Sequence, residues 1–154
     1  MRKFLSILIV ILLVGVLSAC NGKTLNAKEQ LVLDYINIFN NGTDKEAKNK
    51  FVEENCLPES KPLFLLALKV NNQKERILKD PEVLESIDLE DSEKKGTAVL
   101  VKGKNSDGID SERIVVFIGD KMGMELFPNA KDENKNYEKL RSAFKLSPYN
   151  CVKS

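Results

Sequence analysis

The segment "GTAVLVKGKNSDGIDSERIVVFIG", residues 96–119, decides the fold class of this chain. It holds two short runs rich in β-branched and aliphatic residues, GTAVLVKGK and SERIVVFIG, with the turn-forming NSDG between them. Two similar runs flank it: VLESIDLED begins at Val83, after a change of period at Glu82, and MGMELF begins at Met122. SEKKG and GDK separate the outer runs from the inner ones. Four strands joined by short turns predict an antiparallel meander.

The segment before the strands has the periodicity of an amphipathic helix. Asn26 and Glu29 have capping-box spacing, and the helix that they begin is expected to end at the NNG of residues 40–42. Apolar residues recur between these limits at steps of three and four, which predicts one buried face: Leu31, Val32, Tyr35, Ile36, Ile38 and Phe39.

Two more helical stretches are expected before the first strand. Thr43 and Glu46 repeat the capping pattern and predict a second helix that ends at Cys56. Ser60 precedes PLFLLALKV, residues 62–70, with a proline near the start of the stretch. This third stretch is apolar nearly all round, so it is expected to be sandwiched inside the domain.

The tail after Pro128 turns polar and then places Tyr137, Leu140 and Phe144 at helical spacing. We expect one short C-terminal helix, held against the body by these three side chains. Helices first and a sheet second predict an α+β architecture, with N-terminal helices packed on the four-stranded meander.

The order of elements, together with NIFNNGTDKEAKNKF at residues 37–51, resembles the nuclear-transport-factor-2-like (NTF2-like) superfamily over residues 27–127. The resemblance implies a cone-shaped fold, which occurs in many small lipoproteins of Gram-positive bacteria. Enzymes of that superfamily use tyrosine and aspartate inside the cone. Tyr35 is the residue to examine, but Asp34 is turned aside by roughly 100° on a helix, so core packing of Tyr35 is favoured. A cystatin-like wrap of the sheet around one helix is the alternative fold.

The first 19 residues have the three-part layout of a secretory signal. Two basic residues follow Met1, residues 4–17 are almost wholly apolar, and two small residues end the segment. The apolar stretch of 14 residues is shorter than the roughly 20 that a membrane-spanning helix needs, so an uncleaved anchor is the weaker alternative.

LSAC, residues 17–20, resembles the bacterial lipobox at all four positions. The resemblance implies that the Cys20 thiol receives a diacylglycerol, that the chain is cut between Ala19 and Cys20, and that the new amino group is acylated. The protein would then be held on the extracytoplasmic face of the cell membrane by its lipid. Two acyl chains suit this role, since one chain binds a bilayer only marginally. A buried core cysteine is the disfavoured alternative.

The domain organisation follows from that cleavage. Residues 1–19 are the signal peptide, 20–26 form a lipidated tether, and 27–154 form a single globular domain with its core at 27–127 and an extension at 128–154. The mature chain carries 22 basic and 23 acidic residues. Because nucleic-acid binding needs a basic face, no nucleic-acid partner is expected.

Cys56 and Cys151 remain once Cys20 carries lipid, and they could form a disulfide in an exported protein. Closing that loop would stabilise the fold by about 4–5 kcal/mol on the chain-entropy model. Two free thiols are the alternative. The chain has no histidine and no Cys-x-x-Cys spacing, so no metal site and no cofactor are expected.

The chain lacks an imidazole base and any activated nucleophile, which disfavours an enzyme. Two carboxylate pairs, Glu53 with Glu54 and Asp110 with Glu112, are expected to belong to a solvated surface.

We therefore expect a monomeric, membrane-anchored accessory module of the cell envelope, with an immunity or exclusion role among its candidates, that meets another envelope protein. A lipid-anchored binder of a small apolar ligand is the alternative, and an enzyme is the weakest candidate.

Overall fold

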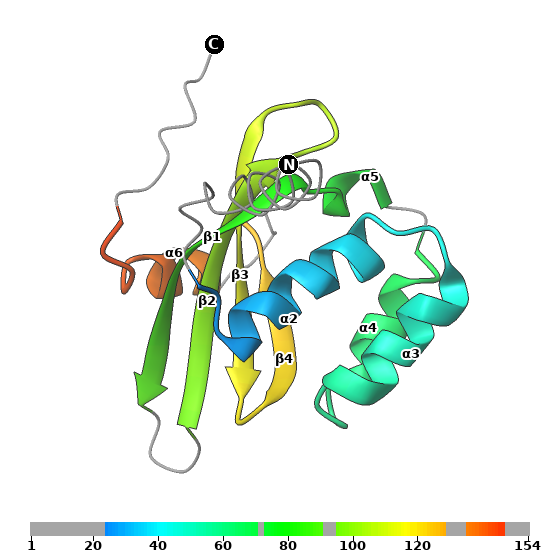
Figure 1. Cartoon of the computed structure of the whole chain (residues 1–154), viewed down its shortest axis with the longest axis horizontal. Coiled ribbons are helices and arrows are strands. Elements are labelled where there is room, and N and C mark those ends of the chain that lie inside the picture. The colour runs from blue at the N-terminus through cyan, green and yellow to red at the C-terminus, as the bar shows by residue number, and fades with distance from the viewer. Residues whose placement is uncertain (1–23, 71–72, 91–94, 129–134, 147–154) are drawn as a thin grey trace, which may run out of the picture.

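The computed structural model describes residues 24–70, 73–90, 95–128 and 135–146 (Figure 1). The helical elements are α2 Ala27–Tyr35, the π-helix η1 Ile36–Asn40, α3 Lys45–Asn55, α4 Lys61–Ala67, α5 Gln73–Arg76 and α6 Asn136–Arg141. The strands are β1 Lys79–Glu90, β2 Lys95–Lys104, β3 Asp110–Ile118 and β4 Lys121–Leu126.

The four strands form one antiparallel sheet in the order β1-β2-β3-β4, which confirms the predicted meander. Helices α2, η1, α3 and α4 lie on one side of this sheet, here called the inner face, and α6 lies on the other side, the outer face (Figure 1). The α+β architecture with N-terminal helices and a short C-terminal helix is therefore confirmed. The first strand begins at Lys79, earlier than the expected change of period at Glu82 and the run that starts at Val83.

Strands β2 and β3 are buried on both faces. Val99 pairs with Val115 on the inner face, and Leu100 pairs with Ile114 on the outer face. A strand covered on both sides needs apolar residues at consecutive positions rather than at alternate ones. This requirement explains the nearly continuous runs AVLV and IVVF.

A β-bulge changes the phase of β4. Phe117 pairs with Met122 and Val116 pairs with Met124, so Gly123 is an extra residue without an opposite partner. As a result Met122 and Glu125 both face the inner side, although they are three residues apart in the chain.

The capping box at the start of α2 is confirmed. The Asn26 side chain accepts hydrogen bonds from the backbone N–H groups of Lys28 and Glu29, and the Glu29 carboxylate accepts one from the Asn26 N–H. Glu29 also accepts a hydrogen bond of 2.9 Å from the Ser86 hydroxyl, and Lys28 Nζ donates to Thr97 Oγ1 at 2.9 Å. The cap therefore also attaches the helix to β1 and β2.

The helical segment ends at Asn40, as the NNG signal predicts. Gly42 is required there, because a Cβ atom on this residue would lie 2.3 Å from the Ile38 carbonyl oxygen. The Asn41 amide then bonds the backbone of Leu78 twice, donating to its carbonyl at 2.8 Å and accepting from its N–H at 3.0 Å. These contacts hold the end of η1 against the segment that enters β1.

Two helix predictions need correction. The residue that caps α3 is Asp44 rather than Thr43, because the Asp44 carboxylate accepts from the N–H groups of the second and third helical residues. The α4 helix is not sandwiched inside the domain: of its residues only Phe64 is buried. It packs beside α3 near the edge of the molecule, where no further described element covers its far side (Figure 1).

The C-terminal prediction is confirmed. Tyr137 and Phe144 are buried on the outer face together with Ala98, Leu100 and Ile114, and Leu140 packs against the same cluster. The helix thus closes the second side of the sheet.

Candidate functional site

Two of the three cysteines predicted as sites, Cys20 and Cys151, lie outside the described residues. Cys56 ends α3, as predicted, and is buried beside Met122 of β4. Burial raises the pKa of its thiol to about 11, so the thiol is protonated near neutral pH. The disulfide between Cys56 and Cys151 stays a prediction.

Within the described ranges, no helix is long and apolar enough to cross a membrane.

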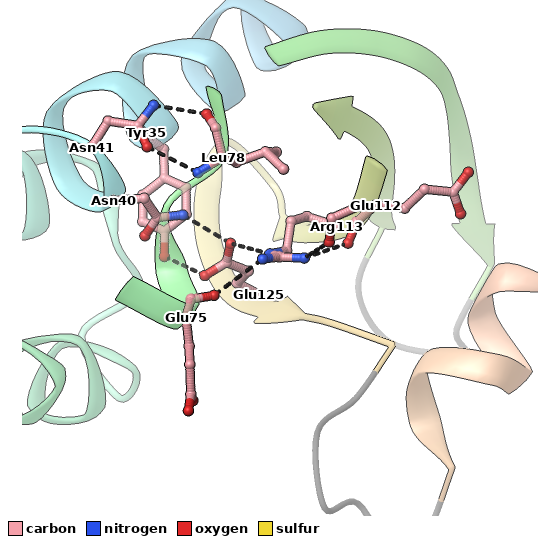
Figure 2. A network of polar contacts seen from close by, with 9 residues as sticks. Tyr35, Asn40, Asn41, Glu75, Leu78, Glu112, Arg113 and Glu125 are labelled. Atoms are coloured by element: carbon pink, nitrogen blue, oxygen red, sulfur yellow. Dashed lines mark hydrogen bonds and ion pairs between the residues drawn. The ribbon is translucent and has the colours of Figure 1, made fainter. Parts of the chain in front are cut away.

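A buried carboxylate lies between η1 and the inner face of the sheet (Figure 2). Glu125 Oε2 accepts a hydrogen bond of 2.9 Å from the Tyr35 hydroxyl, and Glu125 Oε1 accepts one of 2.9 Å from Asn40 Nδ2. The Glu125 side chain is only 4% exposed. We call Tyr35, Asn40, Arg113 and Glu125 the Glu125 cluster.

Arg113 supplies the positive charge of this cluster. Its Nε lies 3.8 Å from Glu125 Oε1, which is ion-pair distance. The guanidinium also donates to the Glu112 carbonyl at 2.8 Å and to the Glu75 carbonyl at 3.2 Å, and it stacks 5.3 Å from the centre of the Phe127 ring. Arg113 thus links β3, β4 and α5.

Burial perturbs the ionisable groups of the cluster. Desolvation raises the pKa of Glu125, against the opposing effect of the Arg113 charge and of the hydrogen bonds from Tyr35 and Asn40. Desolvation and the neighbouring carboxylate both raise the pKa of Tyr35, so its hydroxyl stays a hydrogen-bond donor. Arg113 Nε and Asn40 Oδ1 are buried without a hydrogen-bond partner. These two atoms leave hydrogen-bonding capacity in the cluster unused.

Tyr35 has the structural role that the sequence favours. Its ring stacks on Phe39 at 5.2 Å and lies within 5.9 Å of the rings of Phe51 and Phe64. The Asp34 carboxylate instead accepts a hydrogen bond of 3.0 Å from the Gln30 side chain. The carboxylate that meets the Tyr35 hydroxyl comes from Glu125, 90 residues later in the chain.

Sequence reasoning missed Arg113 and Glu125. Strand alternation could have identified Arg113, because it precedes Val115 by two residues and therefore shares its inner face. Glu125 could not be found in this way, since only the bulge at Gly123 brings it to the same face as Met122.

A second buried ion pair lies on the outer face. Arg141 of α6 donates to both carboxylate oxygens of Glu112, at 2.7 and 3.1 Å, and the Tyr137 hydroxyl donates to the same group at 3.1 Å. Figure 2 shows that the neighbouring side chains of Glu112 and Arg113 point to opposite sides of the sheet.

The expectation of a solvated Glu112 is therefore wrong, since α6 covers it. Its predicted companion Asp110 is exposed and pairs with Lys104 at 3.0 Å, and Glu53 and Glu54 are exposed as expected.

The exposed apolar side chains of the α4 region form the most evident contact surface. Leu63, Leu66 and Val70 are 69%, 56% and 53% exposed; Leu63 and Leu66 lie about one turn apart on α4, and Val70 follows shortly after the helix ends. We call these three residues the α4 stripe. Large apolar side chains that gather in this way are typical of contact sites.

Within the described part of the chain, no group of three or more potential ligand side chains could hold a metal ion. Comparison with family models, curated proteins and solved structures found no match to this chain. The internal polar groups pair mainly with one another, an arrangement that stabilises a fold.

Proposed function

We propose that this chain is a lipoprotein of the extracytoplasmic face of the cell membrane, anchored through S-diacylglycerol and N-acyl groups on Cys20. The observation that carries the proposal is LSAC at the end of a charged and apolar leader. The position of α2 supports it, because this helix begins directly after its cap Asn26, six residues beyond Cys20 in the sequence.

The domain is proposed to act as an interaction module for another envelope protein, in an accessory, immunity or exclusion role, and not as an enzyme. The α4 stripe supports this function, because it offers apolar contact area outside the core. Glu59 and Lys69, the exposed charged residues that flank this segment in the sequence, have opposite signs, which favours a protein surface over an anionic bilayer. The domain is proposed to be a monomer before it meets this partner.

The NTF2-like cone is proposed as the finer description of the fold. Helices stacked on the inner face of a meander sheet support it. The alternative function, binding of a small apolar ligand inside the cone, has less support, because the four aromatic rings under the helices pack against one another.

Cys20→Ser is expected to abolish incorporation of a fatty-acid probe in a bacterium that expresses the full chain, because the serine hydroxyl does not accept the diacylglycerol. Metabolic labelling followed by mass analysis of the mature amino terminus measures this. Cys56→Ser is the matched control and should keep the label. A mature chain that begins at any residue other than Cys20 would contradict the anchor.

A photo-cross-linking residue in place of Leu66 is expected to give one discrete adduct in the membrane fraction. The same residue in place of Lys50, exposed on α3, should give none. Adding Cys20→Ser should reduce the Leu66 adduct at least tenfold, because anchoring raises the effective concentration of the two proteins. Equal adducts at both positions, or an adduct insensitive to the anchor, would argue against the interaction module.

A further inference from the structure

The domain is attached to its proposed anchor at the start of α2. Leu25 packs against the core cluster of the inner face, and Asn26 caps the helix that follows. Cys20 precedes Leu25 by five residues in the sequence. An extended chain covers about 3.3–3.6 Å per residue, so this stretch spans at most about 18 Å by any path. A lipid on Cys20 would therefore keep this point of the domain within that distance of the bilayer surface.

The start of α2 lies at one end of the sheet. Lys28 Nζ donates to Thr97 Oγ1 at 2.9 Å, and Thr97 is the third residue of β2. The antiparallel register continues this level across the sheet, because Thr97 pairs with Phe117 and Phe117 pairs with Met122. We call Thr97, Phe117 and Met122 the anchor row.

The anchor row leads to the start of α4. The Leu57 N–H donates to the Met122 carbonyl at 2.9 Å, and the Leu57 carbonyl accepts from the N–H of Lys61, the first residue of α4, at 3.0 Å. Neighbouring strands are about 4.8 Å apart, so Leu57 lies roughly 15 Å across the sheet from Thr97. The helix is seven residues long, which at 1.5 Å per residue is about 10 Å. The two leucines of the α4 stripe therefore stay close to the level of the anchor row.

The other end of the sheet lies farther from the attachment point. The turn between β2 and β3 follows Lys104, seven residues after Thr97 in the same strand (Figure 1). At about 3.3 Å per residue this distance is roughly 23 Å. The α4 stripe thus belongs to the half of the domain that the tether holds near the bilayer, and the β2–β3 turn belongs to the other half.

This position restricts the partner of the α4 stripe. Apolar side chains held close to the bilayer surface face the extracytoplasmic parts of proteins that share the membrane. Two proteins confined to one membrane also meet at a raised effective concentration, which makes a small apolar contact sufficient. A soluble protein gains no such advantage.

We propose that the α4 stripe binds a protein that is itself held in the same membrane, at the extracytoplasmic surface, and not a soluble protein or the lipid. The inference rests on the proposed lipid anchor and interaction module, and it names the class of partner that this module meets.

Energy transfer from the domain to the bilayer tests the orientation. The full lipidated chain is reconstituted in nanodiscs that contain an acceptor dye on the lipid headgroups. A donor dye is attached to an azide-bearing residue that replaces either Glu59 or Asp107, both of which are exposed. Transfer should be at least twofold more efficient from position 59, beside the start of α4, than from position 107 in the β2–β3 turn. Equal or reversed efficiencies would overturn the orientation and the proposal with it.

A stiff spacer in the tether tests the partner. Twenty prolines inserted between Gly22 and Lys23 add about 60 Å, because a polyproline helix rises about 3.1 Å per residue. The adduct of a photo-cross-linking residue at Leu66 should then fall at least threefold, since the membrane fixes the level of the partner and the spacer moves the stripe away from it. The same twenty prolines added after Ser154 leave the tether unchanged and should leave the adduct unchanged.

The outcomes separate this inference from the proposed function. A chain with its natural tether that gives no adduct at Leu66 contradicts the interaction module itself. A discrete protein adduct that the tether spacer does not reduce identifies a soluble partner and overturns this inference alone. An adduct with lipid identifies the bilayer as the occupant and also overturns it.

Discussion

Arg141→Met is expected to lower the free energy of unfolding by about 3–5 kcal/mol, because it leaves the Glu112 carboxylate buried without its cation. The side chains of Arg141 and Glu112 are 6% and 9% exposed, so solvent cannot replace the lost charge. Urea denaturation of the chain that begins at Asn21, followed by circular dichroism, measures the change. The loss should appear as a lower midpoint with an unchanged slope.

Two further variants separate a buried charge from a general effect of the substitution. Lys104→Met removes the cation of the exposed Lys104–Asp110 pair and should cost less than about 1 kcal/mol. Combining Arg141→Met with Glu112→Leu should recover much of the stability, because an apolar pair has no unpaired charge. A double variant as unstable as Arg141→Met alone would show that the packing of α6, and not the ion pair, governs the effect.

Glu125→Leu is expected to cost a similar amount, about 3–5 kcal/mol, on the opposite face of the sheet. The substitution leaves the Arg113 guanidinium without its anion and removes the acceptor of the Tyr35 hydroxyl and the Asn40 amide. Glu54→Leu, at an exposed position of α3, is the matched control and should change stability by no more than about 0.5 kcal/mol.

The pH dependence of Glu125→Gln tests the ionisation of the same carboxylate. Burial raises the pKa of Glu125 above its ordinary value of 4.5, so the folded chain binds this proton more tightly than the unfolded chain does. The stability of the wild type relative to Glu125→Gln should therefore be greatest below pH 4.5 and should fall as the pH rises through the raised pKa. Denaturation curves at a series of pH values measure the difference, and a rise with pH would mean that Arg113 outweighs burial.

Arg141→Met and Glu125→Leu each remove the partner of a charged residue on β3, one on each face of the sheet. Glu112 holds the C-terminal helix on the outer face, and its neighbour Arg113 contacts α5 and β4 on the inner face, where its partner Glu125 also binds Asn40 of η1. Adjacent residues of a strand point to opposite faces of the sheet, so Glu112 and Arg113 each need their own partner from a distant segment. The two pairs thus fix the positions of layers that apolar contacts alone would orient less specifically.

The sequence by itself determined the elements whose signals are local. The Asn26 and Glu29 cap, the end of the first helical segment at Asn40, the four strands and the spacing of Tyr137 and Phe144 all follow from residues close together in the chain. Side-chain capping and the periodicity of apolar residues act over a few positions, so they can be identified without knowing the fold. The LSAC motif is local in the same sense, and it is the basis of the proposed anchor.

Only the tertiary structure decided which charged residues became internal and which apolar ones stayed outside. Glu125 meets Tyr35 because a bulge at Gly123 shifts the phase of β4, and Glu112 is buried because α6 covers it. Leu63 and Leu66 remain exposed although their helix is apolar nearly all round, because nothing in the described fold packs over that side of α4. Burial depends on which distant segment covers a residue, and the residue's immediate neighbours in the sequence do not indicate which segment that is.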